Sequence, residues 1–269
     1  MSAAFLQQLA AVDVRHPWFA PYAGWLDAGR QAVQAGSSAA AALAGLAPRE
    51  SGVAVPEFIP AFNLTPGEAY EAFVARTGSV PTRDNLHDFF NGLAWLRFTR
   101  TKRRLNELQA GEIARAGVGP RRGAVRDALT LFDENGALLA APQPLWEALL
   151  ARDWRRLFVQ LRPLWSEAAV VVFGHALLEK LVSPRKDLTA HVWCANTAPV
   201  AGSPDRWLAE QLTAGRLSEK PFTPLPLLGI PGWWAGNQDF SFYDDALVFR
   251  PAGRASQRAP ARRSTASRT

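Results

Sequence analysis

Two short motifs in this sequence pair an imidazole with a carboxylate, and their residue types are the best suited to chemistry. His87 directly precedes Asp88, and His175 precedes Glu179 by four residues. A carboxylate beside an imidazole favours the charged ring and raises its basicity. Such a group can act as a general base or as a metal ligand. The same residues could instead form a solvated polar face and a structural His–Glu pair.

The spacing predicts where each motif lies. A helix starting near Thr82 to Asp84 would carry an apolar stripe opposite a polar face; the stripe contains Leu86, Phe89, Phe90 and Leu93, and the polar face contains Asp84, His87, Asp88 and Asn91. His175 follows an apolar strand candidate, 168–173, and Gly174. We expect it to begin a helix at the end of a strand, a common place for ligand sites, with Glu179 one turn away on the same face.

His191 lies in a third segment, the strand candidate 188–193, where alternation places it on one face with Thr189 and Trp193. Taken alone, this pattern is more typical of a structural histidine. The two imidazole–carboxylate motifs are embedded in apolar sequence, where an unpaired charge is costly. We therefore hypothesise one shared pocket lined by His87, Asp88, His175, Glu179 and His191. His175 would be the acid or base, and Asp88 or Glu179 would orient an imidazole or bind a divalent metal such as zinc.

A basic segment, 97–126, contains nine basic and two acidic residues. Four of its arginines flank glycine turns whose amides could help to bind a phosphate or another anion; they are Arg115, Arg121, Arg122 and Arg126. The alternative is a solvated helix face followed by a basic loop. Residues 251–269 add five arginines and no acid, so the net charge of +6 reflects these two segments and is not a general nucleic-acid signature.

The composition bounds the class of protein. With 269 residues and 48% hydrophobic residues, the chain can bury a substantial core. The single cysteine, Cys194, excludes an intrachain disulfide and a cysteine-based zinc site, and suits a reducing compartment. No apolar run reaches the roughly 18 residues of a membrane span, so we expect a cytoplasmic protein with no membrane partner. The abundance of Arg and Ala indicates a GC-rich bacterial genome.

The order of the predicted elements indicates an α+β fold, a mainly helical single domain with short strands, over residues 1–250. Segment 129–139 contains Asn135-Gly136 between apolar residues, which predicts a β-hairpin with positive φ at both turn residues. Residues 251–269 lack apolar anchors, and we expect them to form a disordered basic tail that is dispensable for folding.

Several stretches together resemble a bacterial family, domain of unknown function number three-thousand-and-twenty-five. The stretches are 80–91, 101–106, 129–136, 173–180 and the Pro-Gly-Trp-Trp at 231–234. The resemblance covers most of residues 50–250 and implies a bacterial protein. It implies no activity and no catalytic residue.

Three classes of function therefore remain open. The first is a non-catalytic binding or scaffold protein that uses Trp233 and Trp234 to contact a protein partner. The second is a hydrolase-like enzyme with a His/carboxylate site, and the third is a nucleic-acid-binding protein that uses segment 97–126. Convergence of the three histidines would favour the enzyme. An exposed tryptophan patch would favour the scaffold protein, and salt-dependent affinity for DNA would favour the nucleic-acid-binding protein.

Overall fold

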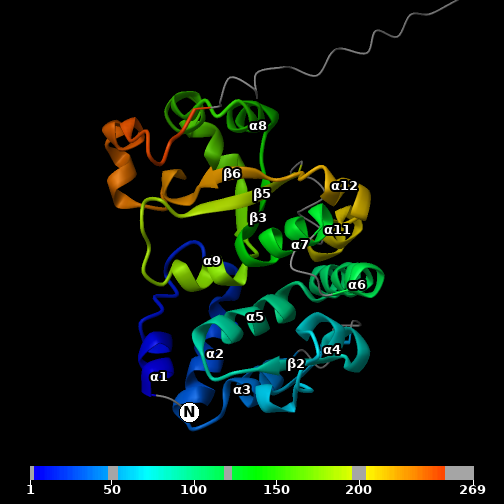
Figure 1. The fold of residues 1–269 in the computed structure, drawn as a ribbon. Helices are drawn as coiled ribbons and strands as arrows, with labels where there is room; N and C mark the ends of the chain where they lie inside the picture. Colours follow the sequence, from blue (N-terminus) through cyan, green and yellow to red (C-terminus); the bar gives the residue numbers. More distant parts are fainter. Residues whose placement is uncertain (1–2, 48–53, 118–122, 196–203, 252–269) are drawn as a thin grey trace, which may run out of the picture.

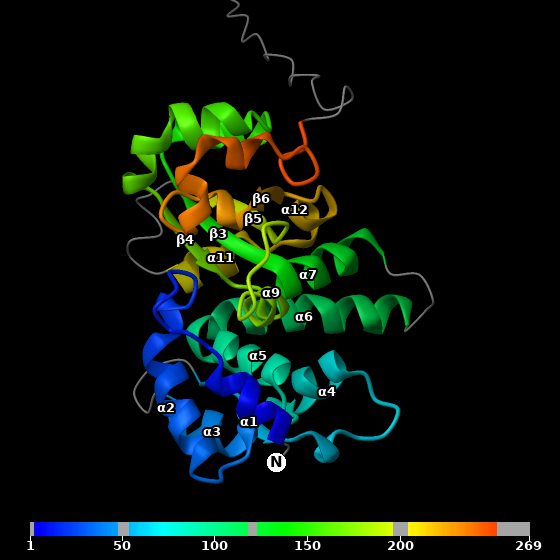
Figure 2. The same cartoon turned by 90° about the vertical axis from the view of Figure 1, so that its left-hand side faces the viewer.

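A four-stranded mixed sheet lies above a layer of helices and a smaller two-stranded sheet in the view of Figure 1. The computed structural model describes residues 3–47, 54–117, 123–195 and 204–251. The large sheet has the order β4-β3-β5-β6, in which β3 and β5 are parallel and the two outer pairs are antiparallel. The small sheet pairs β1 and β2 in parallel. In Figure 2 as well, a layer of helices lies directly below the large sheet.

The strands are short and the helices supply most of the regular structure. The strands are β1 Glu57–Pro60, β2 Ser79–Thr82, β3 Gly136–Ala140, β4 Ala169–Val172, β5 Thr189–Ala195 and β6 Thr223–Pro226. The α-helices are α1 Ala3–Ala10, α2 Ala23–Gln34, α3 Ala39–Leu46, α4 Tyr70–Thr77, α5 Leu86–Arg97, α6 Thr99–Ala116, α7 Ala124–Asn135, α8 Gln143–Leu150, α9 His175–Lys180, α11 Pro204–Gln211 and α12 Ala214–Ser218. Short helical turns are η1 Ala20–Tyr22, η2 Ala61–Asn63, η3 Arg156–Gln160, η4 Arg162–Glu167, η5 Leu227–Gly229, η6 Ala235–Gln238 and η7 Phe240–Asp244.

These elements confirm the predicted α+β class. Within the described residues, no helix combines the length and apolar composition needed to cross a bilayer. The expected basic tail lies outside the described residues, except for Pro251.

Helix α5 is a central element because it packs against both α3 and α9. It begins at Leu86, slightly later than the sequence predicts, because the side chain of Asn85 caps it and accepts a hydrogen bond from the Asp88 amide at 2.7 Å. Its apolar residues Phe89, Phe90 and Leu93 are fully buried. Their burial fixes the orientation of the opposite, polar face, which carries His87.

The predicted β-hairpin at Asn135-Gly136 is wrong. Residues up to Asn135 form the end of α7, and β3 starts directly at Gly136, which has a φ of −77° rather than a positive value. The physical reason is that Phe132 is completely buried, with its ring stacked 5.0 Å from Phe173 and 4.9 Å from Phe222. Helical spacing of the apolar residues before Asn135 outweighs the local turn preference of Asn-Gly.

Gly136 is nevertheless required, for a steric reason. A Cβ atom at this position would lie 2.3 Å from the backbone oxygen of Phe132, and backbone cannot move aside as a flexible side chain can. We expect Gly136→Ala to lower the free energy of unfolding by about 1–3 kcal/mol, the usual cost of overpacking. Urea unfolding measures this loss.

Gly111→Ala is the matched control, because a Cβ at that helical position would meet nothing within 4 Å. We expect this control to stabilise the protein by about 0.5–1 kcal/mol. Equal stability of the two variants would contradict the packing at Gly136.

Candidate functional site

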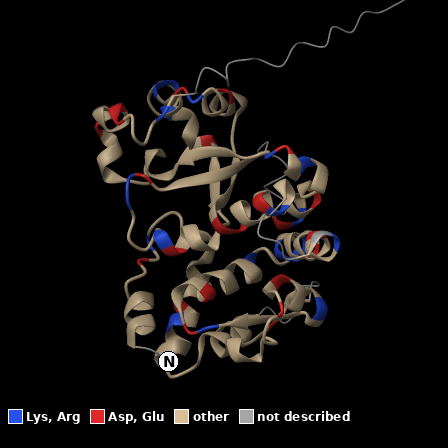
Figure 3. Ribbon diagram, in the orientation of Figure 1, with Lys and Arg blue, Asp and Glu red and all other residues tan. Residues whose placement is uncertain are grey.

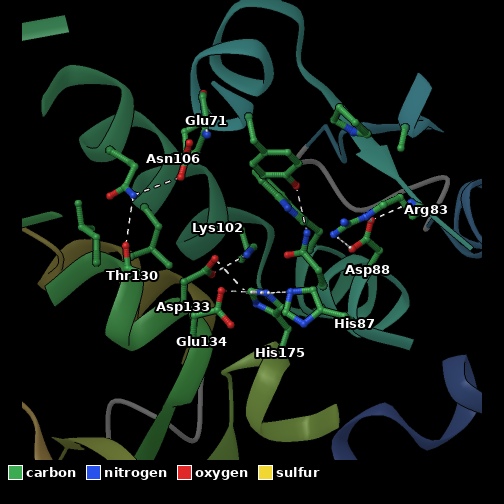
Figure 4. A pocket seen from close by; sticks show the side chains of 18 of the residues that line it. Glu71, Arg83, His87, Asp88, Lys102, Asn106, Thr130, Asp133, Glu134 and His175 are labelled. Atoms are coloured by element: carbon green, nitrogen blue, oxygen red, sulfur yellow. Dashed lines mark hydrogen bonds and ion pairs between the residues drawn. The ribbon is translucent and has the colours of Figure 1, made fainter. Parts of the chain in front are cut away.

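A cavity of about 500 Å³ opens between helices α4, α5, α6 and α7, with the start of α9 at one end (Figure 4). Its apolar walls come from Ala61, Leu64, Tyr70, Pro81, Trp95, Leu105 and Leu129. Its polar walls come from Glu71, Arg83, His87, Asp88, Asn91, Lys102, Asn106, Gln109, Thr130, Asp133, Glu134 and His175. The volume falls within the range of ordinary small-molecule sites.

Two imidazoles meet at one end of this cavity. The Nε2 atoms of His87 and His175 lie 3.1 Å apart, and the ring centroids are separated by 4.6 Å at an interplanar angle of 74°. His87 lies in the first turn of α5, and His175 is the first residue of α9. The structure therefore brings together the two histidines that the sequence analysis placed in one pocket.

Each imidazole has a carboxylate beyond its other ring nitrogen. Glu179 Oε2 lies 3.0 Å from His87 Nδ1, and Asp133 Oδ2 lies 3.8 Å from His175 Nδ1. A third carboxylate oxygen, Glu134 Oε1, lies 3.6 Å from His175 Nε2, on the side where the two rings meet. Figure 4 shows Asp133 and Glu134 reaching from α7 toward the two rings.

A close backbone approach positions this third carboxylate. Gly174, directly before His175, packs so tightly on the end of α7 that a Cβ there would lie 2.5 Å from the Glu134 oxygen and 2.6 Å from the Asn135 nitrogen. The absence of a side chain at Gly174 lets the first turn of α9 lie against the last turn of α7. This contact holds Glu134 and His175 next to each other.

Burial governs the charges at this end of the cavity. His175 is buried, which lowers the pKa of its imidazole to about 4 and keeps the ring neutral at pH 7. Burial, together with the charge of Asp133, raises the pKa of the Glu134 carboxyl. Burial also acts to raise the pKa of the Asp133 carboxyl, but its interactions with Lys102 and the two histidines, of which Lys102 contributes most, together outweigh burial and lower that pKa.

Lys102 itself is buried in the cavity wall, and its Nζ lies 2.5 Å from Asp133 Oδ1. The ammonium also lies 5.5 Å from the centre of the Trp95 ring, within cation–π range. Asp133 is therefore held between Lys102 and His175.

Two other predicted site residues, Asp88 and His191, do not join the two imidazoles. Asp88 lines the same cavity, but its carboxylate forms a two-point ion pair with Arg83, with distances of 2.9 and 3.0 Å, and does not contact an imidazole. His191 is not among the residues that line the cavity; it lies in the middle of β5, opposite Gly136 on β3 and Pro224 on β6. The predicted approach of His191 to the two other histidines is not observed, because the strand holds it within the sheet.

The sequence analysis missed Lys102, Asp133 and Glu134. Asp133 and Glu134 lie directly before Asn135-Gly136, and the hairpin prediction assigned them to a turn. Helical spacing of Leu129 and Phe132 was the signal that could have placed them on a helix facing α5 and α9. Lys102 was treated as one charge of the basic segment, and its position on the buried face near the start of α6 gave no separate signal.

The basic segment does not form one arginine cluster in the described residues. Arg115 pairs with Glu112 on the exposed face of α6, whereas Arg126 is buried in α7. Arg121 and Arg122 lie outside the described residues. Basic and acidic residues are interleaved over the described chain rather than separated on two faces (Figure 3).

The tryptophan pair is half-buried and does not form an exposed patch. Trp233 and Trp234 both pack against the core, and the Trp233 ring centroid lies 5.9 Å from that of Trp18. The exposed patch that a scaffold protein would use is therefore not observed at these two residues.

Comparison with known proteins gives one match. The family model described as "Protein of unknown function (DUF3025)" matches residues 57–253. No curated protein and no solved structure matches the chain. The matched region includes both histidines, the three acidic residues beside them and the whole large sheet. Because the match covers well over half of the chain, the protein is a member of the DUF3025 family.

Proposed function

We propose that this protein is a metal-dependent hydrolase whose metal ligands are His87, His175 and Glu134. The ligand atoms are the Nε2 atoms of the two histidines and a carboxylate oxygen of Glu134, which all lie within 4.8 Å of one another. Two histidines and one glutamate are a known ligand set for catalytic zinc, and they leave a position open for water.

The observation that carries this proposal is the pair of Nε2 atoms 3.1 Å apart, each on a ring whose Nδ1 faces a carboxylate. A carboxylate at Nδ1 favours the proton on that nitrogen and leaves a lone pair on Nε2. Two lone pairs and the Glu134 carboxylate then converge on one point. A cation between the three groups would offset their repulsion; without one, the 3.1 Å separation allows the two nitrogens to share a proton in an N–H···N hydrogen bond.

The distances agree with a small divalent ion. Metal–ligand bonds of about 2.0–2.2 Å at a tetrahedral angle separate neighbouring ligand atoms by about 3.3–3.6 Å. The separations here are 3.1 Å between the two nitrogens and 3.6 Å between Glu134 Oε1 and His175 Nε2. Glu179 would then be the carboxylate that orients metal-bound His87, a usual arrangement around catalytic zinc; Asp133 Oδ2 lies 3.8 Å from His175 Nδ1, too far for a hydrogen bond.

A bound divalent ion would lower the pKa of its water toward 7 and polarise a carbonyl oxygen. Held by His87, His175 and Glu134, the ion would thereby supply the chemistry for hydrolysis of an acyl bond to nitrogen or oxygen, in which the water oxygen would end on the acyl carbon and one water proton on the leaving group.

Other features fit the setting of such an enzyme. Cys194 is the single cysteine and is half-buried, and burial raises the pKa of its thiol to about 12, so the thiol is expected to be unreactive. A single free cysteine also suits a reducing compartment. Together with the Arg- and Ala-rich usage, this supports the bacterial cytoplasm as its location. The half-buried tryptophan pair gives the scaffold alternative less support than the converging histidines give the enzyme.

The test is a calorimetric titration of the metal-stripped protein with Zn²⁺. We expect one ion per chain, and we expect His191→Ala, a matched histidine outside the cavity, to bind it as the wild type does. A wild-type protein that binds no zinc, or binds it equally well after loss of His87, would contradict the proposal.

The variant Glu179→Gln tests whether the Glu179 carboxylate, which is not a proposed metal ligand, supports zinc binding by orienting His87. The amide retains the shape of the side chain and can still accept a hydrogen bond from His87, but it removes the negative charge. We expect zinc affinity to fall by roughly 10–100-fold with one ion per chain still bound, as for other residues that orient ligands. The same calorimetric titration measures the change. Unchanged affinity would show that the Glu179–His87 contact is only structural.

A further inference from the structure

The cavity has a second end, and the geometry points to a binding site there for a cationic amine, with Glu71 as its partner. This inference rests on the proposed function, because it names the substrate class: an acylated amine that carries a second, protonated amino group. The amide bond would lie at the two histidines and the ammonium group at Glu71.

The charges that line the cavity can be assigned one by one. Arg83 is paired with Asp88, and Lys102 is paired with Asp133. Glu134 belongs to the proposed metal ligands. Glu71 is then the remaining charged residue of the lining, and among the described residues no Lys or Arg forms an ion pair with it.

The surroundings of the Glu71 carboxylate are polar but uncharged. Gln109 Nε2 donates to Glu71 Oε1 at 3.3 Å and also lies 3.4 Å from the Thr130 hydroxyl. The side-chain amide of Asn106 donates a hydrogen bond to the backbone carbonyl oxygen of Glu71 at 2.9 Å and so holds the backbone of Glu71 in place. One neutral donor does not compensate a half-buried carboxylate. A cationic group of the ligand would compensate the charge of the Glu71 carboxylate. The amide and hydroxyl oxygens nearby would offset the desolvation of that cationic group.

The two ends lie a defined distance apart. Lys102, which contacts Asp133 at the histidine end, and Gln109, which contacts Glu71, are seven residues apart on α6. Seven residues of helix span roughly 10 Å. Figure 4 shows Glu71 on the far side of the cavity from His87 and His175.

The walls between the ends suit an alkyl chain. Leu105 and Leu129 line the cavity from α6 and α7, and the aromatic side chains of Tyr70 and Trp95 line it as well. A substrate with a hydrolysable acyl group, a short alkyl chain and a terminal ammonium group would therefore match the metal end, the apolar middle and Glu71 in turn. Among the described residues that line this path, an anionic phosphate or carboxylate would meet no unpaired Lys or Arg.

The test compares two hydroxamates on the zinc-loaded protein. Hydroxamates bind zinc, so caproic hydroxamate and ε-aminocaproic hydroxamate share one anchor and differ only in the terminal ammonium group. We expect the amino compound to bind roughly tenfold more tightly in low salt, because its ammonium pairs with Glu71 in a partly desolvated site. Glu71→Gln should remove this preference and leave the affinity for caproic hydroxamate unchanged. Glu219→Gln, an exposed control, should retain the preference.

A second pair of probes needs no metal. On the metal-stripped protein, n-hexylamine should bind more tightly than n-hexanol, and again only when Glu71 is present. If zinc does not bind but hexylamine still distinguishes wild type from Glu71→Gln, the metal centre fails and the amine site stands. If zinc and both hydroxamates bind but the ammonium group confers no preference, or the preference survives in Glu71→Gln, the amine site is overturned and the metal centre stands.

Discussion

Replacing Lys102 by Met is expected to lower the free energy of unfolding by about 3 kcal/mol. Its side chain is 5% exposed and that of Asp133 is 30% exposed, so the ion pair is largely removed from water. Removing one member of such a pair leaves the other charge uncompensated, which costs about 3–5 kcal/mol in a fully buried pair. The partial exposure of Asp133 places the expected loss at the lower end of this range. Met retains the length and apolar contacts of the Lys102 stem against Trp95.

Urea unfolding in the presence of a chelator measures this loss without a contribution from bound metal. Lys220→Met, at an exposed position, should change stability by no more than about 0.5 kcal/mol. In the double variant Lys102→Met/Asp133→Asn, the total loss should be smaller than the sum of the two single losses, because the uncompensated charge is gone. Additive effects would show that the two side chains do not act as a pair.

His175→Ala is expected to weaken zinc binding by more than about 100-fold. Loss of a residue that only orients a ligand costs 10–100-fold, and His175 supplies one of three proposed ligand atoms. Calorimetric titration of the metal-stripped variant measures the affinity. The far-ultraviolet circular dichroism spectrum and the unfolding midpoint show whether the variant remains folded.

His191→Ala serves as the control here too, since it removes an imidazole of the same type from the neighbouring strand β5. If His175→Ala binds zinc as tightly as His191→Ala does, His175 is not a ligand. If His87→Ala loses zinc but His175→Ala does not, the ion is held by His87 with other groups and the proposed ligand set is wrong.

The contact between His87 and His175 could be predicted from the sequence because both histidines are embedded in strong apolar patterns. The stripe containing Phe89, Phe90 and Leu93 specifies which face of α5 is buried and hence where His87 points. The apolar strand before Gly174 specifies where α9 begins. Both patterns are local, and burial of their apolar residues in the core fixes the polar residues beside them.

Asp133 and Glu134 could not be predicted in the same way. Asn135-Gly136 is a strong local hairpin signal, yet the rings of Phe173 and Phe222 stack on Phe132 and stabilise a helix through Asn135. These contacts come from residues far away in the sequence, so the only local sign of the helix was the spacing of Leu129 and Phe132, which competed with the Asn-Gly turn signal. His191 is the opposite case. Its strand was predicted correctly and its residue type is suitable, but it does not line the cavity.

A zinc anomalous difference map from a crystal of the zinc-loaded protein tests most directly where the proposed metal ion binds. We expect one peak about 2.0–2.2 Å from His87 Nε2, His175 Nε2 and an oxygen of Glu134. A further, non-protein ligand should occupy the open position. A map with no peak between the two imidazoles, or with zinc bound only by surface residues, would contradict the proposed metal site.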